Sequence, residues 1–436
     1  MTISPLILYY GLPLLIILFY YLWKRVQKQH LSQRIFDEVK ASGMAEPASL
    51  HPLIDHNLCL GCASCINACP EKTKNVLGLI HGKAHLINPT HCIGHGACKT
   101  ACPFNAIELV FGTEKRGVDI PQVDKNFQTN VPGIFIAGEL GGMGLIRNAV
   151  RQGVEAVNTI VNLPGIKRGG KLDLIIVGAG PAGIAASLAA KEKKLDFITL
   201  EQDSLGGTVS HYPRGKIVMT APAVLPIVGK MQFRETTKEI LMEFWQSVVS
   251  QSGLKIKHRE QVESIEIEEQ GFHVKTINNN YHSRAVLLAI GRRGTPRKLD
   301  VPGEDLPKVV YRLIDAEQYR NQHVLIVGGG DSALEAAVSI AEEPGTTVTI
   351  SYRSEAFSRA KEKNRTNASA IQKAGRLNIL MKSNVKIIEP HRVIIKTGND
   401  EISIANDTVI VCAGGILPTG FLKKTGVTVD TKFGTA

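Results

Sequence analysis

The apolar positions of the chain form two kinds of pattern, and the first is one long uncharged run. Residues 3–23 carry no charge, and Lys24, Arg25 and Lys28 follow at once. The run matches the roughly 20 residues that cross a bilayer as a helix, and cations after it favour a cytoplasmic location for the rest. No basic start or small-residue cleavage site marks a signal peptide. We therefore expect an uncleaved transmembrane helix in the inner (cytoplasmic) membrane of a prokaryote.

The second pattern is an apolar strand followed by a glycine-rich turn and an alanine-rich helix. It begins at Leu172 and is repeated from His323. Each unit of strand, turn and helix is typical of a dinucleotide-binding half of a parallel sheet. The chain is therefore expected to be an α/β protein with two Rossmann-like dinucleotide-binding domains.

Composition narrows the class of protein. The chain has 436 residues, of which 21% are charged and 44% hydrophobic, which is typical of globular domains rather than disorder. Its formal net charge of +11 is spread over loops without a basic, aromatic-laced stripe, so nucleic acid is not an expected partner. Cysteines other than Cys412 are confined to residues 59–102. That density favours a metal site in a reducing compartment over a disulfide framework.

The first cysteine run, "CLGCASCINACP", has the spacing of an iron–sulfur loop. Cys59, Cys62, Cys65 and Cys69 are followed by Pro70, which is the C-x2-C-x2-C-x3-C-P run of bacterial ferredoxins. A zinc site does not require a third cysteine in the same loop. The second run keeps Cys92, Cys98, Cys102 and Pro103 but has His95 at the position of the missing cysteine.

Residues 51–112 as a whole resemble a two-cluster bacterial ferredoxin, with "AIELV" as the strand that closes its small α+β fold. The resemblance implies two clusters, expected to be [4Fe-4S], with crossed ligands. The first cluster takes Cys59, Cys62, Cys65 and Cys102, and the second takes Cys69, Cys92 and Cys98 with His95 at its fourth corner.

Three interpretations of His95 stay open. The ring ligates iron, it stands beside a three-iron cluster, or it is a surface histidine next to a lost site. Ligation is favoured over the last because the other three ligands are intact. A histidine ligand removes a negative charge, and the same exchange raises the reduction potential of Rieske centres.

The first glycine turn has the residues that a dinucleotide requires. Gly178 permits the tight turn, Gly180 lets the backbone approach a pyrophosphate, and Gly183 permits close helix packing. Glu201 ends the next strand at the place where an acidic residue binds ribose hydroxyls.

The second turn differs at the ribose position. Gly328, Gly330 and Ala333 form the turn, but Arg353 ends the following strand, with Arg359 near it. Arginine suits a 2′-phosphate, so NADPH is favoured over NADH.

Residues 113–436 resemble the flavoprotein disulfide-reductase superfamily, which implies FAD in the first turn and a nicotinamide in the second. Thioredoxin reductases have a Cys-x-x-Cys before the second turn, whereas "VVYRLIDAEQYRNQ" contains no cysteine. The chain is therefore more similar to the thioredoxin-reductase-like ferredoxin–NADP reductases, which lack that pair.

The order of segments departs from that family. The family's closing segment, similar to "TNVPGIFIAGE", lies at 123–157, ahead of the first glycine turn, with Gly138 and with Glu139 where the family has Asp. We interpret this as a circular permutation that attaches the end of the FAD domain to the ferredoxin; alternatively the segment packs elsewhere or against a neighbouring subunit. The expected divisions are an anchor (1–23), a stalk (24–50), the ferredoxin-like domain (51–112), the permuted segment (113–165), the FAD domain (166–300), the NAD(P) domain (301–412) and a return to the FAD domain (413–436).

These features predict a membrane-anchored oxidoreductase. Electrons pass from NAD(P)H through FAD and two iron–sulfur clusters to a quinone, a membrane redox subunit or a carrier, or in the reverse direction. A small-molecule disulfide reductase and a non-enzymatic redox sensor are the alternatives, and a homodimer stays open. No residue is assigned a catalytic role, and His211 and Tyr212 are expected to be structural.

Overall fold

The computed structural model places most of the chain. It describes residues 5–41, 47, 50–92, 94–112, 117–141, 145–292, 294–358 and 360–434, without the side chains of residues 5–11 and 219. Arg359, one of the two arginines expected at the 2′-phosphate, lies outside the described residues.

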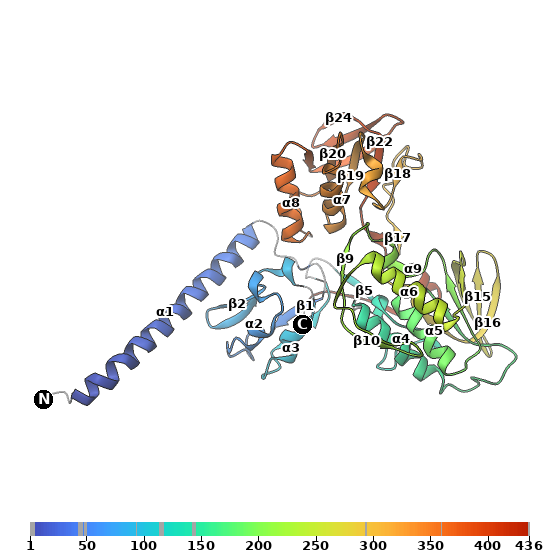
Figure 1. Ribbon diagram of the computed structural model, residues 1–436, viewed down its shortest axis with the longest axis horizontal. Helices are drawn as coiled ribbons and strands as arrows, with labels where there is room; N and C mark the ends of the chain where they lie inside the picture. The colour runs from blue at the N-terminus through green and yellow to red at the C-terminus, as the bar shows by residue number, and fades with distance from the viewer. Residues whose placement is uncertain are drawn as a thin grey trace.

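A long helix, α1 (Pro5–Ala41), extends away from the rest of the molecule (Figure 1). Its last turns pack on the small cysteine-rich domain, where the Phe36 ring lies 6.1 Å from the ring of His85. Gly78 in this domain leaves room for the helix, because a Cβ there would lie 2.5 Å from Ser32 Oγ on α1. Residues 5–41, which belong to the expected anchor and stalk, thus form one continuous helix.

The predicted membrane span finds no support in the structure. In the part of the chain whose side chains are described, no helix is both long enough and apolar enough to cross a bilayer. The described apolar run of α1 ends at Trp23 and is followed by Lys24 and Arg25, and the first part of the predicted span falls on residues whose side chains lie outside the description.

The cysteine-rich domain contains two cysteine loops, each followed by a short helix, and two pairs of strands. The strand predicted to close the domain, β4, pairs antiparallel with β1, and β2 pairs with β3 in a hairpin. Its elements are β1 (His51–Ile54), α2 (Ser64–Ala68), η1 (Lys72–Lys74), β2 (Leu77–Ile80), β3 (Lys83–Leu86), η2 (Pro89–His91), α3 (Ala97–Thr100) and β4 (Ile107–Val110).

A seven-stranded sheet forms the core of the largest domain, with the order β13-β8-β7-β16-β15-β14 and with β6 also paired to β16. The strands β6, β7, β8, β13 and β16 run parallel to their neighbours in this group, and β14 and β15 are antiparallel. The strands are β6 (Ile134–Ile136), β7 (Leu172–Val177), β8 (Phe197–Glu201), β13 (Ile256–His258), β14 (Val262–Glu268), β15 (Gly271–Thr276) and β16 (Asn280–Leu288).

The segment that the sequence places out of order lies inside this domain. Strand β6 continues the sheet beside β16, with Ile136 opposite Leu288, and α4 (Ile146–Ile160) packs against α5 (Pro181–Glu192). Gly153 is the point of closest approach, because a Cβ there would lie 2.2 Å from the carbonyl oxygen of Ala182. The described residues of the range 123–157 therefore pack within this domain of the same chain.

The far end of the chain pairs with the start of the same segment. Strand β27 (Val429–Lys432) runs antiparallel to β5 (Val118–Pro121), and the Asp119 carboxylate accepts hydrogen bonds from the hydroxyls of Thr419 and Thr431. The two sequence-distant ends of the domain thus meet at one place, as a permutation requires.

The third domain has a five-stranded parallel sheet of order β18-β25-β19-β20-β21, with α7 and α8 packed against it. A three-stranded antiparallel sheet follows β21. The elements are β18 (Val309–Val310), β19 (His323–Val327), α7 (Asp331–Ala341), β20 (Thr347–Tyr352), α8 (Glu362–Lys373), β21 (Leu377–Met381), β22 (Ser383–Ile388), β23 (Arg392–Thr397), β24 (Asp400–Ala405) and β25 (Thr408–Val411).

The remaining elements cover or connect these domains, and α6 packs its buried Trp245 against α5. They are η3 (Glu139–Gly141), η4 (Gly207–His211), β9 (Ile217–Met219), β10 (Ala223–Leu225), β11 (Gly229–Met231), β12 (Glu235–Thr237), α6 (Lys238–Ser252), β17 (Thr295–Pro296), η5 (Ala316–Tyr319), β26 (Gly415–Ile416) and α9 (Thr419–Lys424).

We expect Gly153→Ala to lower the apparent melting temperature by a few degrees, because overpacking a tight contact costs about 1–3 kcal/mol. Circular dichroism during heating measures this. Gly420→Ala on α9 is the matched control, since nothing lies within 4 Å of its Cβ position. Equal melting of the Gly153 variant and the wild type would contradict the close packing of α4 on α5.

Candidate functional site

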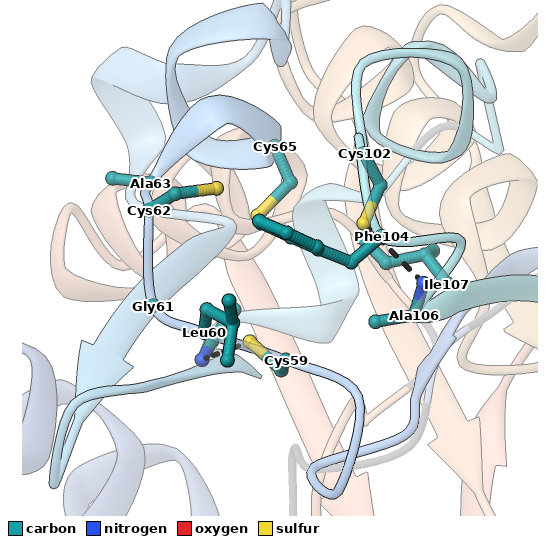
Figure 2. A pocket seen from close by; sticks show the side chains of 11 residues that line it. Cys59, Leu60, Gly61, Cys62, Ala63, Cys65, Cys102, Phe104, Ala106 and Ile107 are labelled. Carbon is teal, nitrogen blue, oxygen red and sulfur yellow. Dashed lines mark hydrogen bonds between the residues drawn. The ribbon is translucent and has the colours of Figure 1, made fainter.

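Four of the predicted cysteines surround a first pocket in the cysteine-rich domain. Cys59, Cys62 and Cys65 come from the loop that leads into α2, and Cys102 follows α3. Figure 2 shows their sulfur atoms around a common space, with the Phe104 side chain lying between them in this view. The structure thus brings Cys102 to the first run, as the resemblance to ferredoxins implies.

Backbone geometry holds the first loop in place. Gly61 and Ala63 have φ of +67° and +62°, and a Cβ on Gly61 would lie 1.9 Å from the carbonyl oxygen of Gly82. The amide of Ala84 donates to Cys59 Sγ at 3.4 Å, and that of Ala106 donates to the Sγ of Cys102 at 3.4 Å. Gly82 and Ala84 belong to the β2–β3 hairpin. The spacing of the cysteines did not predict that this hairpin contacts the first loop.

The second pocket is lined by the complementary set. Cys92 and Cys98 are joined there by Cys69 from the first run, and His95 lies at the border with its side chain exposed. The amide of Ala97 donates to His95 Nδ1 at 3.3 Å. The structure therefore places all eight predicted ligands around two pockets in the crossed arrangement.

The chemistry of these side chains fits iron–sulfur clusters. Burial raises the pKa of the Cys65 thiol to about 11, and burial likewise raises that of Cys92 to about 11. Without a cation such thiols stay protonated at neutral pH, so a metal centre must displace their protons. In the described ranges, no group of three or more His, Cys, Asp or Glu is arranged to hold a single metal ion.

One cysteine of the first pocket differs from the others. Cys62 is exposed, and its hydrogen bond with the Ser64 hydroxyl is the main cause that lowers the pKa of its thiol. A lower pKa favours the thiolate, which is the form of cysteine that binds metal.

The first glycine turn joins β7 to α5 and has the shape of a phosphate-binding turn. Gly178 has φ of +104°, and a Cβ on Gly183 would lie 1.8 Å from the carbonyl oxygen of Gly178. At Gly180 the nearest atom to an added Cβ is 3.9 Å away. Space is therefore left where a pyrophosphate would approach the helix N-terminus.

Glu201 lies beside this turn at the end of β8 and is only 6% exposed. Its Oε2 accepts a hydrogen bond from the amide of Ala179 at 2.7 Å, and its Oε1 accepts one from that of Asp203 at 2.9 Å. Each carboxylate oxygen has a further lone pair, so the side chain is positioned to accept from ribose hydroxyls.

Gly138 and Glu139 follow β6 at the same edge of the sheet as the first glycine turn. The amide of Ala137 donates to the carbonyl oxygen of Leu288, and that of Gly138 donates to Gln152 Oε1 at 2.8 Å. Gln152 was not foreseen from the sequence, because its role depends on the return of α4 over β6. The carboxyl ends of parallel strands form the ligand crevice of such sheets.

The second glycine turn joins β19 to α7. Gly328 has φ of +145°, and a Cβ there would lie 2.4 Å from the carbonyl oxygen of Cys412. Nothing lies within 4 Å of the Cβ position of Gly330, and Ala333 is fully buried. Arg353 is exposed directly after β20, where a 2′-phosphate could reach it.

Two further contacts shape this turn and were missed from the sequence. Tyr352 lies over the turn, so that a Cβ on Gly329 would lie 2.5 Å from its ring. Asp331 Oδ1 accepts hydrogen bonds at 2.7 Å from the amide of Lys361 and from Asn364 Nδ2. These contacts tie the start of α7 to the start of α8.

Known proteins resemble part of the chain. A bacilliredoxin reductase of Bacillus subtilis is 26% identical over 60% of the chain and 82% of its own length. A ferredoxin–NADP reductase of Pediococcus pentosaceus is 30% identical over 51% of the chain, which spans 62% of that relative. The solved structure of a bacillithiol disulfide reductase from Staphylococcus aureus is 25% identical with a TM-score of 0.53, over 60% of this chain and 81% of that one.

Two family models match separate parts of the sequence. A 4Fe-4S dicluster domain matches residues 51–103, which contain both cysteine runs, and the pyridine nucleotide-disulphide oxidoreductase family matches residues 175–435. These matches agree with FAD, NAD(P)H and iron–sulfur clusters as the cofactors. Because the second match covers more than half of the chain, the protein belongs to the pyridine nucleotide-disulphide oxidoreductase family, with a 4Fe-4S dicluster domain ahead of it.

Proposed function

We propose that the protein exchanges electrons between NADPH and a one-electron partner, such as a ferredoxin-like carrier, through its flavin and iron–sulfur sites. When bound, these cofactors supply hydride exchange at the flavin and single-electron transfer at iron. The resemblance to ferredoxin–NADP reductases supports this reaction class. The direction of flow follows from the potential of the partner.

The observation that carries the proposal is the join between the cysteine-rich domain and the FAD crevice. Only residues 111–117 separate β4 of the first from β5 of the second. The guanidinium of Arg292, four residues beyond the end of β16, lies 5.8 Å from the Phe111 ring centre and donates to the carbonyl oxygen of Asp119 at 3.2 Å. These contacts tie residues on both sides of the join to a residue that follows β16, and this supports an electron path between the two proposed sites.

Residues of the chain provide placement for this reaction. Glu201 and the turn at Gly178 are the proposed FAD contacts in the crevice, with Gly138 and Glu139 on the neighbouring strand end. Gly328, Gly330 and Ala333 form the proposed NADPH turn, with Arg353 at the 2′-phosphate. The crossed cysteine sets, with thiols mostly buried, are the proposed iron ligands.

A second candidate, reduction of a small disulfide, is favoured by the likeness to a bacillithiol disulfide reductase. Anaerobic assays with NADPH separate the two reactions. We expect faster turnover with a one-electron carrier such as ferredoxin than with bacillithiol or glutathione disulfide. The reverse order of rates would favour the disulfide reductase.

Removal of one ligand tests the electron path. We expect Cys102→Ser to lose iron and to reduce a one-electron carrier at least about tenfold more slowly, since a neutral hydroxyl replaces a thiolate ligand. Flavin bleaching by NADPH should keep its wild-type rate.

Two further variants control this experiment. Cys69→Ser removes the ligand that crosses to the second pocket, and Cys412→Ser changes the one cysteine outside both pockets. Cys412→Ser should keep the full iron content. If the Cys102 variant loses iron but still reduces the carrier at the wild-type rate, electrons do not pass through the clusters.

Glu201→Gln should weaken FAD retention about tenfold, because a charge-assisted hydrogen bond to ribose is replaced by a neutral one. The ratio of protein to flavin absorbance after dialysis measures retention. Glu155→Gln on α4, which alters an exposed carboxylate paired with Arg151, is the control. Equal flavin content in all three proteins would place the ribose away from Glu201.

Arg353→Ala should raise KM for NADPH about tenfold and leave KM for NADH unchanged, because only NADPH carries the 2′-phosphate. Steady-state kinetics with both nucleotides measure the change. Arg376→Ala removes another exposed arginine of this domain and should alter neither value. A parallel rise of both KM values in the Arg353 variant would indicate a general rather than a phosphate-specific role.

A further inference from the structure

The two cysteine loops place equivalent residues in the same local geometry. Cys62 lies between Gly61 and Ala63 with positive φ, and His95 lies between two glycines, at positions 94 and 96, with φ of +68° and +85°. A short helix begins two residues after each of them, at Ser64 and at Ala97. His95 is therefore the positional counterpart of Cys62, and both side chains are exposed at the border of a pocket.

Each of these side chains contacts the residue two positions ahead, but with different consequences. Cys62 Sγ lies 3.4 Å from Ser64 Oγ. A thiolate has several lone pairs, so it can accept a hydrogen bond and bind iron together. An imidazole nitrogen has one lone pair, and the Nδ1 of His95 uses it to accept from the amide of Ala97 at 3.3 Å.

The hydrogen bond to Ala97 fixes the protonation of the ring. A backbone amide only donates, so Nδ1 is unprotonated, and in the neutral ring the proton is on Nε2. A nitrogen that carries a proton has no lone pair for a metal. Ligation through Nε2 would require the proton to move to Nδ1, where it would face the Ala97 amide as a second donor. Neither nitrogen of His95 is thus available to iron while this contact exists.

The contact also has a structural purpose. The amide of Ala97 is the first of α3, and the first amides of a helix lack partners within it. Gly96, the N-cap residue, has no side chain to accept from them. His95 supplies the acceptor instead, next to Cys98 on the same helix. Its ring is held by the first turn of α3.

We propose that His95 caps α3 and is not an iron ligand, so that the second pocket holds a three-iron cluster through Cys69, Cys92 and Cys98 alone. This inference rests on the proposed function, because it assumes clusters in both pockets. Of the three interpretations that the sequence left open, the geometry points to the second, in which the histidine lies beside a three-iron cluster and does not bind iron. The Nε2–H then faces outward as a hydrogen-bond donor.

Iron analysis and electron paramagnetic resonance of the full-length protein test the proposal. We expect about seven iron atoms per chain, the sum for one four-iron and one three-iron cluster, and an oxidised three-iron signal without strong imidazole nitrogen coupling in pulsed spectra. His95→Asn should preserve iron content and spectrum, since its Oδ1 can still accept from Ala97. His95→Cys should add about one iron atom per chain and remove the three-iron signal.

Cys62→Ser is the matched control. It alters the counterpart position of the first loop and should deplete the four-iron cluster. Strong nitrogen coupling in the wild type, or loss of iron in His95→Asn, overturns the proposal while the electron-transfer function stands. A chain that takes up no iron in either pocket contradicts the proposed function and this inference together.

Discussion

The close packing of α4 on α5 is the constraint on which the rest of the architecture depends. Helix α5 carries the first glycine turn at its start, and α4 belongs to a segment that precedes this turn in the sequence. Because Gly153 has no side chain, the α4 backbone reaches the carbonyl oxygen of Ala182, and Gln152 can bind the amide of Gly138. This helix contact thereby holds the segment that carries β6 against the sheet, beside the first glycine turn and directly after the cysteine-rich domain in the chain.

The cysteine-rich domain depends on a second constraint, which is chemical. Burial raises the pKa of Cys65, Cys69, Cys92 and Cys98. Metal binding and folding are coupled wherever ligands must lose protons in a buried site. Since Cys69 and Cys102 each cross to the other half, neither half can complete its pocket alone. Loss of one cluster should therefore loosen the whole domain rather than one loop.

Much of this arrangement was predictable from the sequence, because the relevant signals are local. The spacing of Cys59, Cys62, Cys65 and Cys69 and the strand–glycine–helix pattern at Gly178 need only neighbouring residues to be recognised. Contacts between distant segments were not predictable from spacing. Gln152 bound to Gly138 and the Gly82 carbonyl packed on Gly61 depend on tertiary structure. The chemistry of His95 also needed the structure, because sequence identifies the ring but not which nitrogen is occupied.

The contacts between domains differ in kind, and this difference bears on how the molecule works. The cysteine-rich domain is joined to the proposed FAD crevice through the chain itself and Arg292, but it contacts the nicotinamide domain through the buried His91, whose Nε2 lies 2.8 Å from the exposed Glu362 carboxylate. Burial lowers the pKa of His91, so at neutral pH this contact is a hydrogen bond from a neutral ring. The FAD and nicotinamide domains likewise meet at Lys216 and Glu335. Partly exposed ion pairs contribute about 0–1 kcal/mol each, and interfaces of this polar kind permit relative domain motion. The nicotinamide domain is thus the part that can move, while the proposed exit for electrons keeps its place beside the flavin crevice. Under the proposed function, hydride exchange and single-electron exchange can then alternate without separating the cysteine-rich domain from the proposed flavin crevice.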